Sequence, residues 1–237
     1  MKDVLIKAEG ISKSYKLREE DRVILDEISL SIRAGEMVTI TGDSGSGKSN
    51  LLGILAGILS PDTGNVKYTL GGNETDVGGI RDEKMASLRR SFISYVPQSQ
   101  DYIDSLTVEE NIKIADFFSS KSRKDKESLE NSRDEKVQDR LGIGELKDNY
   151  PRDLSGGEIR RMIIARALYT NPQIIIADEP SNDLDRKNRE DIIKEFKNAR
   201  DRGIAVVIVS HDELISNNSD IVYELSNGKL EKKEVAV

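Results

Sequence analysis

The feature that most constrains this chain is a glycine-rich run, Gly42-Asp43-Ser44-Gly45-Ser46-Gly47-Lys48-Ser49, which fits the pattern G-x-x-x-x-G-K-[ST]. The apolar segment Met37–Ile40 precedes it, and leucines and isoleucines at helical spacing follow it from Leu51 to Ile58. Glycines let the backbone curl so that successive N–H groups point inward, and the helix turns its positive end toward the same point. The run therefore predicts a strand, a phosphate-binding loop and a helix, with a nucleoside triphosphate as ligand.

Two residues of the loop carry side-chain chemistry for phosphate. Lys48 offers a mobile positive charge to the β- and γ-phosphates, and the hydroxyl of Ser49 suits Mg²⁺. The alternative is an ordinary Gly-Ser loop, which is disfavoured because the fixed positions match by chance in on the order of one chain in a hundred of this length. Kinases, GTPases and motors share such a loop, so it does not choose among them.

A second motif is the apolar run Ile174–Ala177, which ends in two adjacent carboxylates, Asp178 and Glu179. A buried strand can deliver Asp178 to the edge of a sheet, near a metal ion held by Ser49. Glu179 lies one residue further on and suits a general base that polarises the attacking water. The alternative is a strand that simply ends in a charged turn.

The order of the other segments predicts an α/β fold. Strands are expected at Val4–Ile11 and Val23–Ile32, and the last third of the chain alternates strand and helix in the βαβ manner, with helix Asp185–Arg200, strand Ala205–Val209 and a hairpin at Asn227-Gly228. Gly71–Gly79 is predicted to be a hairpin or loop. The sequence thus predicts a parallel-sheet core, antiparallel strands near the N-terminus and an inserted helical region.

The middle of the chain has a different character from about Leu88 to Arg152. Ile93–Val96 is predicted to be a strand, and Val108–Phe118 and Glu135–Leu141 are predicted to be helical. Between them, Ser119–Arg133 is dense in Ser, Lys, Glu and Arg, which is typical of a solvated helix face or loop.

Composition limits the classes of partner. The 237 residues include 43 acidic and 36 basic side chains, and the net charge of −7 disfavours a sequence-independent grip on nucleic acid. Cysteine is absent, which excludes disulfides and thiol catalysis. No apolar run approaches the ~18–20 residues that cross a bilayer, and the charged start Met1–Lys7 is not a signal peptide. We expect no direct membrane insertion, so a function at a membrane would require this chain to dock on another protein.

The run Leu154-Ser155-Gly156-Gly157-Glu158 resembles the signature motif of the ATP-binding-cassette (ABC) ATPases. Other elements similar to that family follow in order, and the resemblance extends from Tyr15 to His211. It implies a P-loop NTPase core with an N-terminal antiparallel β subdomain and an inserted helical subdomain. A single domain, 1–237, is expected, with the nucleotide-binding core and β subdomain at 1–98 and 158–237 and the helical subdomain at 99–157.

The resemblance also implies a head-to-tail homodimer that forms on ATP binding, with each ATP between the phosphate loop of one subunit and the signature motif of the other. Its catalytic residues would be Glu179, His211, Lys48 and Gln98, and its Mg²⁺ ligands Ser49, Gln98 and Asp178. The residues expected to contact ATP are Tyr15, by stacking on adenine, then Gly42, Asp43, Ser44, Gly45, Ser46, Gly47, Lys48, Ser49 and Asn50, and finally Ser155, Gly156, Gly157 and the interface residue Asp185.

Two positions depart from the family pattern. Asn50 stands where threonine is usual, and because an amide can also donate to phosphate we expect weaker or altered ATP binding rather than none. Ile159-Arg160 stands where glutamine is common. Arg160 and Arg161 are expected to be ordinary solvated helix arginines.

Among ABC proteins, the segments Tyr150–Asp153 and Asp183–Asp185 are similar to bacterial macrolide-export, lipoprotein-release and antimicrobial-peptide-export ATPases. That likeness implies an ATPase on the cytoplasmic face of the cell membrane that powers a separate permease, in the export direction. The short stretch after His211 predicts no accessory C-terminal domain, and apolar residues in Ser99–Leu106 are a candidate docking surface for the permease. Alternatives left open are a soluble non-transport ABC ATPase, such as the iron–sulfur cluster assembly or DNA-repair type, and a non-catalytic nucleotide-binding scaffold.

Overall fold

A computed structural model describes residues 2–17, 20–78, 80, 82–117, 133–182 and 184–233. The charge run predicted to be solvated therefore lies outside the described residues, except for Arg133. That residue does not fit the expectation, because its side chain is only 4% exposed and pairs with Asp116 at 3.0 Å. Phe118, Gly79 and Asp183 also lie outside the described residues.

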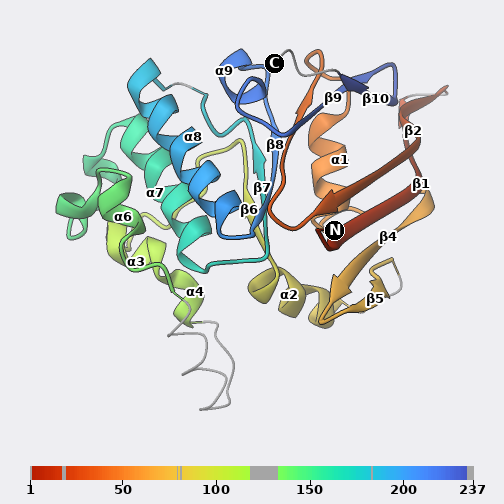
Figure 1. The fold of residues 1–237 in the computed structure, drawn as a ribbon. Helices are drawn as coiled ribbons and strands as arrows, with labels where there is room; N and C mark the ends of the chain where they lie inside the picture. Colours follow the sequence, from red (N-terminus) through yellow and green to blue (C-terminus); the bar gives the residue numbers. More distant parts are fainter. Residues whose placement is uncertain are drawn as a thin grey trace.

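Within the described ranges the strands form two sheets (Figure 1). The larger has the order β10-β9-β3-β8-β7-β6, and all its neighbouring strands are parallel except β9 and β10. Its strands are β3 (Met37–Thr41), β6 (Ile93–Val96), β7 (Ile174–Asp178), β8 (Ala205–Val209), β9 (Ile221–Ser226) and β10 (Lys229–Lys233). The smaller sheet is antiparallel, with the order β2-β1-β4-β5. Its strands are β1 (Val4–Leu17), β2 (Glu20–Arg33), β4 (Thr63–Leu70) and β5 (Asn73–Asp76).

Helices cover both faces of the larger sheet. The longer ones are α1 (Lys48–Leu55), α2 (Asp82–Ser91), α7 (Gly156–Tyr169) and α8 (Arg186–Asp201). The shorter ones are α3 (Val108–Ile112), α4 (Ile114–Phe117), α6 (Val137–Arg140) and α9 (Glu213–Ser216), with 3₁₀ turns at Gly144–Leu146 and Pro151–Asp153. Across the described part of the chain, each helix is too short or too polar to pass through a bilayer.

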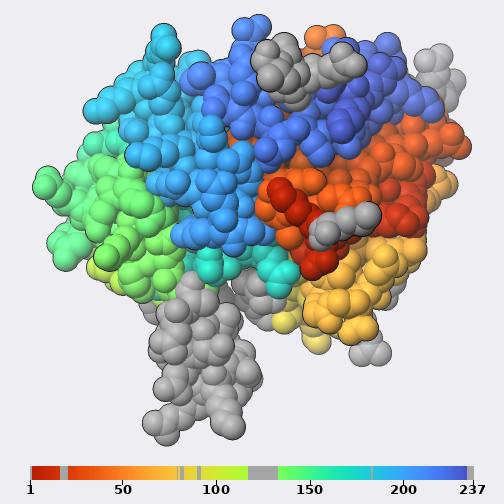
Figure 2. Space-filling model, viewed as in Figure 1, coloured from red at the N-terminus to blue at the C-terminus, as the bar shows by residue number. Residues whose placement is uncertain are grey.

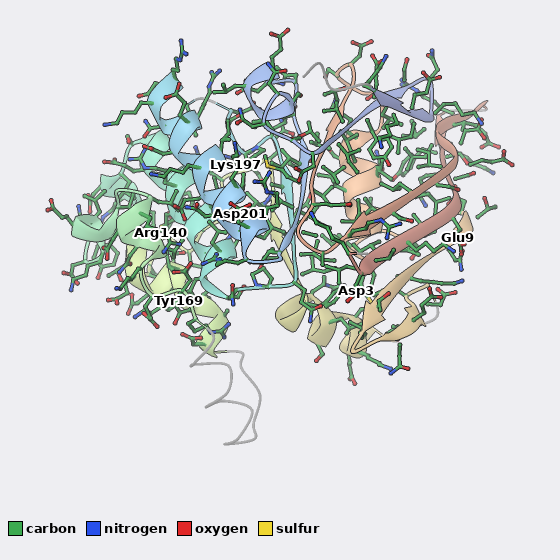
Figure 3. The ribbon with its side chains drawn as sticks, viewed as in Figure 1. Asp3, Glu9, Arg140, Tyr169, Lys197 and Asp201 are labelled. Atoms are coloured by element: carbon green, nitrogen blue, oxygen red, sulfur yellow. The ribbon has the colours of Figure 1, made fainter. Side chains whose placement is uncertain are left out.

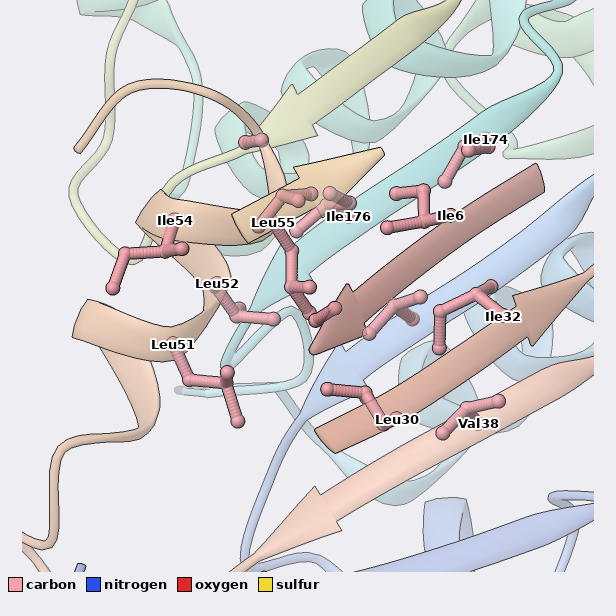
Figure 4. Close-up of a cluster of buried hydrophobic side chains, with 14 of the residues drawn as sticks. Ile6, Leu30, Ile32, Val38, Leu51, Leu52, Ile54, Leu55, Ile174 and Ile176 are labelled. Atoms are coloured by element: carbon pink, nitrogen blue, oxygen red, sulfur yellow. The ribbon is translucent and has the colours of Figure 1, made fainter. Parts of the chain in front are cut away.

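The parallel strands β7 and β8 are buried along their whole length, because helices or strands cover both faces of their sheet. Alternate residues of β7 enter two different cores: Ile174 and Ile176 pack with α1 and the smaller sheet, as Figure 4 shows, whereas Ile175 and Ala177 pack with α7 and α8. This burial fixes β7 tightly, and the residue at its end is held with it.

The predicted fold class is confirmed. The structure has the parallel core, the antiparallel strands of the N-terminal part of the chain and the helices of the middle region. The antiparallel strands and the helices of the middle region lie on opposite sides of the molecule in Figure 2. One strand was not predicted: β4 precedes β5, and the two form a hairpin that turns at Gly71-Gly72. The predicted hairpin at Asn227-Gly228 joins β9 to β10.

The short helices of the middle region are joined to α8 and α7 by polar contacts. Arg140 of α6 donates to Glu195 of α8 at 2.8 Å and also pairs with Asp134 at 2.6 Å. The hydroxyl of Tyr169, at the end of α7, donates to Asp116 at 2.7 Å. Arg140 and Tyr169 both lie on the helical side in Figure 3, far from Glu9 of β1.

Candidate functional site

The phosphate-binding loop lies between β3 and α1, as its pattern predicted. Gly42 and Gly47 have φ values of 142° and 103°, a region that residues with a Cβ rarely adopt. A Cβ on Gly42 would collide with the carbonyl oxygen of Leu225, and a Cβ on Gly47 would lie 2.6 Å from Cγ2 of Ile24. The loop therefore needs glycine at both positions, for backbone shape and for space.

Helix α1 begins at this loop with an open N-terminus. Gly47 is its N-cap, and glycine has no side chain that could accept from the N–H groups of the first turn. Such uncapped N–H groups and the helix dipole form a ready anion site. The ammonium of Lys48 bends back over the loop and donates to the carbonyl oxygens of Gly42 and Asp43 at 2.8 and 2.7 Å.

Asp178 is the last residue of β7, and it is 3% exposed. Its Oδ1 atom is buried and has no hydrogen-bond partner among the described residues. Burial raises the pKa of this carboxyl, and the charge of Glu179 raises it further, while the Ser49 hydroxyl, Lys48 and Arg160 lower it. A buried carboxylate oxygen beside a serine hydroxyl is a donor set that suits Mg²⁺.

Glu179 follows directly and has a φ of 46°, in the left-handed region. Its N–H donates to the carbonyl of Val209 at 2.9 Å, and its Oε1 lies 3.1 Å from Nδ1 of His211. Its second carboxylate oxygen, Oε2, is buried and has no partner within the described part of the chain. Glu179 and His211, predicted separately at the ends of two strands, therefore meet because β7 and β8 are neighbours.

These groups surround one cavity of about 540 Å³. Its predicted lining residues are Gly42, Ser44, Gly45, Gly47, Lys48, Ser49, Asn50, Gln98, Asp178, Glu179 and His211, and it also includes Ile24, Asn182 and Val209. Asp43 and Ser46 line a second pocket, which the loop shares with the hairpin turn at Asn227-Gly228. A cavity of this size that combines an open helix N-terminus, a lysine and two carboxylates can hold a phosphate chain and a divalent cation.

The signature residues do not line this cavity. Ser155 is the N-cap of α7, and its hydroxyl accepts from the N–H of Glu158 at 3.4 Å, while the carboxylate of Glu158 accepts from the N–H of Ser155 at 2.7 Å. Gly156 and Gly157 form the first turn of the helix. Asp185 likewise caps α8, accepting from the N–H of Asn188 at 2.8 Å. In a single subunit these residues therefore begin helices rather than contact the phosphate site.

Tyr15 belongs to β1 and is 41% exposed. Its hydroxyl donates to Oδ1 of Asn50 at 2.7 Å, and the ammonium of Lys13 lies 5.6 Å from the ring centroid. The unusual Asn50 thus fixes the ring that the family resemblance assigns to adenine. The NH₂ group of its amide remains a possible donor to a phosphate.

Comparison with known proteins decides the family. The family model described as "ABC transporter" matches residues 25–182. This chain belongs to the ABC transporter family. It is 37% identical over 221 residues to the macrolide export ATP-binding/permease protein MacB of Salmonella typhi, and 34% identical over 226 residues to MacB of Burkholderia pseudomallei. These alignments cover 93% and 95% of this chain but 33% of each relative, so the chain spans about a third of their length.

A solved structure agrees with this assignment. The ABC cassette fold of this chain is similar to the dimeric, post-hydrolysis structure of the ATP-binding cassette MJ0796 bound to ADP and Pi, with a TM-score of 0.85 and 29% identity. The match covers 98% of this chain and 100% of the other. A second dimeric structure of MJ0796, described as a bacterial ABC transporter cassette, has a TM-score of 0.82 and 30% identity. The chain is accordingly an ABC-type ATPase cassette.

One expectation about the cassette was wrong. Arg160 is not a solvated arginine, since it is only 3% exposed and donates to main-chain carbonyl oxygens beside the cavity. Arg161 is half-buried and donates to Asn188 of α8 at 2.5 Å. The buried residues Ile163, Ile164 and Ala167 lie three, four and seven positions after Arg160, and this spacing is the sequence signal that could have placed Arg160 on the inner face of α7. Asn182, which lines the cavity, was given no role by sequence reasoning.

Proposed function

We propose that this cassette binds ATP with Mg²⁺ in the cavity between α1 and the carboxyl ends of β6 and β7, and hydrolyses it as a head-to-tail homodimer. The work of that cycle would drive a separate membrane permease from the cytoplasmic face, in the export direction. The observation that carries the proposal is the single cavity in which Lys48, Ser49, Gln98, Asp178, Glu179 and His211 all take part.

The phosphate chain would bind to the open N-terminus of α1, and Lys48 would exchange the carbonyl oxygens of its own loop for the β- and γ-phosphates. Ser49 and Asp178, together with Gln98, would hold Mg²⁺. The positive charge of Mg²⁺ would neutralise the negative charge that develops on the phosphate oxygens during hydrolysis. Oδ1 of Asp178, which has no hydrogen-bond partner in the described part of the chain, supports this assignment, because a cation would supply the interaction that burial has removed.

Hydrolysis needs a base on the far side of the γ-phosphate. Among the described residues Oε2 of Glu179 has no hydrogen-bond partner, so it can accept a proton from water, while Oε1 lies 3.1 Å from Nδ1 of His211. The oxygen of that water would form a bond to the γ-phosphorus, and the bond from this phosphorus to the β–γ bridging oxygen would break. The proton passes to Glu179, and ADP and inorganic phosphate leave.

The homodimer is proposed because the signature residues lie away from the cavity of their own chain. Ser155, Gly156 and Gly157 form the exposed or half-buried N-terminus of a 14-residue helix, which can meet a phosphate only in another subunit. The dimeric structures of MJ0796 support this arrangement. Tyr15 would stack on adenine and Asp185 would lie in the subunit interface.

A permease partner is proposed from the similarity to MacB, whose name joins an ATP-binding part to a permease. The candidate docking surface is the segment Ser99–Leu106. Within it Ile103 is 43% exposed, whereas Tyr102 packs against the core that contains α7 and α8. An apolar side chain of this kind suits a short helix of a partner. Changing Ile103→Asp should abolish co-purification with the permease and leave ATPase activity intact, and retained co-purification would refute this surface.

The other functions considered find less support. The family model and the relatives are those of transporters, which does not favour a soluble ABC ATPase of the iron–sulfur assembly or DNA-repair type. The net charge of −7 likewise does not favour nucleic acid as a partner. A non-catalytic scaffold would not need Lys48, Asp178, Glu179 and His211 around one cavity.

The experiment compares two variants in ATP binding and in steady-state phosphate release. Lys48→Ala should abolish detectable hydrolysis, because the charge that compensates the phosphates is lost. Glu179→Gln should bind ATP normally, hydrolyse it at least about 10²-fold more slowly and accumulate as an ATP-bound dimer in size-exclusion chromatography. A Glu179→Gln protein that keeps the wild-type rate would exclude Glu179 as the base, and one that stays monomeric with ATP and Mg²⁺ would count against the homodimer.

A further inference from the structure

Arg160 lies in the second turn of α7, and its side chain reaches the carboxyl ends of two neighbouring strands, β6 and β7. Its guanidinium donates to the carbonyl oxygens of Pro97 at 2.7 Å, Gln98 at 3.2 Å and Glu179 at 2.6 Å. One buried fork therefore binds the backbone at both residues that the proposed function places beside the γ-phosphate.

The peptide of Glu179 needs such support. Its φ of 46° is uncommon for a residue with a side chain, and strained backbone persists only where the surroundings fix it. Its N–H is fixed by Val209 of β8 at 2.9 Å, and its carbonyl oxygen is fixed by Arg160. The two contacts act on opposite sides of the residue, so together they set the direction in which its carboxylate points.

The charge of Arg160 acts on the same place. Asp178 and Glu179 are adjacent and buried, at 3% and 8% exposure, and two neighbouring carboxylates repel each other where water is scarce. A guanidinium that is itself 3% exposed supplies a nearby positive charge. Its fork shape matters too, because a compact lysine ammonium cannot bind separate carbonyl oxygens in the same geometry.

We propose that Arg160 is a positioning residue for ATP hydrolysis, which ties the signature helix of a subunit to the peptides of Gln98 and Glu179 in that same subunit. The inference rests on the proposed function. It has a consequence for the dimer: helix α7, whose N-terminus would face the ATP of the partner, and the general base of its own site move as one unit. Each composite site is thereby linked to the other through a single side chain.

The test measures steady-state ATP hydrolysis by the full chain, expressed per ATP-binding site so that misfolded protein does not count. Arg160→Gln should lower kcat by about 10- to 100-fold, because the base and the amide lose their fixed positions. The KM for ATP should change by no more than about 3-fold, since the phosphate loop is untouched. Arg160→Lys keeps the charge but not the fork, so it should recover part of the lost kcat.

Arg166→Gln is the matched control. Arg166 lies further along the same helix and also donates to a main-chain carbonyl, that of Asp101, at 2.7 Å. It should keep the wild-type kcat. Wild-type kcat in Arg160→Gln, or an equal loss in Arg166→Gln, would overturn the role of Arg160. If Arg160→Gln does not fold, Arg160→Lys decides: a lowered kcat at unchanged KM supports the proposal, and a wild-type kcat overturns it.

The outcome is separable from the proposed function. Turnover retained by Glu179→Gln would reject the base itself, whatever Arg160 does. An inactive Glu179→Gln beside a fully active Arg160→Gln would reject only the positioning role.

Discussion

Two helix N-termini that contain glycine, those of α1 and α7, differ in how the N–H groups of the first turn are satisfied. At α1 the N-cap is Gly47, which is in the left-handed region and has no side chain to cap the helix. At α7 the N-cap is Ser155, and a reciprocal pair of hydrogen bonds with Glu158 closes the first turn. The first end is open to an anion within one subunit, whereas the second is satisfied by its own chain until something else approaches it.

The glycines of the two ends differ in the same sense. Gly42 and Gly47 have backbone angles and close neighbours that only glycine allows. A Cβ on Gly156 would meet only Nε2 of Gln100, at 3.6 Å, which is ordinary van der Waals contact. The fold of the chain therefore requires glycine in the phosphate loop but not at Gly156. We therefore propose that the glycine at position 156 serves a contact outside the subunit.

The largest expected effect is that of Gly47→Ala. The added methyl group would meet the side chain of Ile24 at 2.6 Å in a backbone conformation that alanine rarely adopts. The loop must then change shape, and we expect ATP binding to weaken by about 100-fold, or about 2.7 kcal/mol. Isothermal titration of the isolated chain with ATP measures it. Near-normal affinity would show that the open N-terminus of α1 does not depend on this glycine.

Gly156→Ala should give the next largest effect, and a different kind. Within the subunit the methyl group has room, so ATP affinity should stay unchanged and the free energy of unfolding should rise by at most about 1 kcal/mol. Hydrolysis should fall by about 10-fold or more, since the methyl group would lie against the partner's γ-phosphate. Titration, thermal unfolding and phosphate release on one preparation separate these effects. Full ATPase activity would break the comparison.

The smallest effect concerns the cap itself. Glu158→Ala should lower the free energy of unfolding by about 0.5–1 kcal/mol at neutral pH, as other lost caps do. Hydrogen bonds from the hydroxyl and N–H of Ser155 lower the pKa of Glu158 from its ordinary 4.5. A carboxyl with a lowered pKa stabilises the fold above its unfolded pKa, and this contribution is lost as pH falls through the folded value. The difference between variant and wild type should therefore shrink below about pH 4.5.

Urea unfolding at a series of pH values measures this difference. Glu190→Ala is the control, because Glu190 pairs with the exposed Arg186 on α8 at 3.0 Å and caps no helix. Exposed ion pairs of this kind contribute little, so its effect should be smaller and should weaken with salt. A Glu158→Ala effect that does not vary with pH would mean that the carboxylate does not stabilise the helix end.

Short-range chemistry by itself determined the phosphate loop, the carboxylates at the end of β7 and the caps of α7 and α8. Each depends on residues that are neighbours in the sequence, so spacing is enough: glycines permit the curl between β3 and α1, and alternating burial carries Asp178 to the sheet edge. The family resemblance then named further residues, and the cavity brings Gln98, Glu179 and His211 together as it implied. Their roles in catalysis stay predictions.

Only the tertiary structure decided how distant segments meet. Arg160 binds Pro97 across 63 positions and Glu179 across 19, and Tyr15 reaches Asn50 across 35. Those contacts follow from the order of the strands, in which β6 lies beside β7 and β7 beside β8, and no local pattern encodes that order. An arginine in a helix next to a polar motif is usually solvated. Arg160 is buried because α7 packs against the sheet, which brings the guanidinium within hydrogen-bond distance of three main-chain carbonyl oxygens.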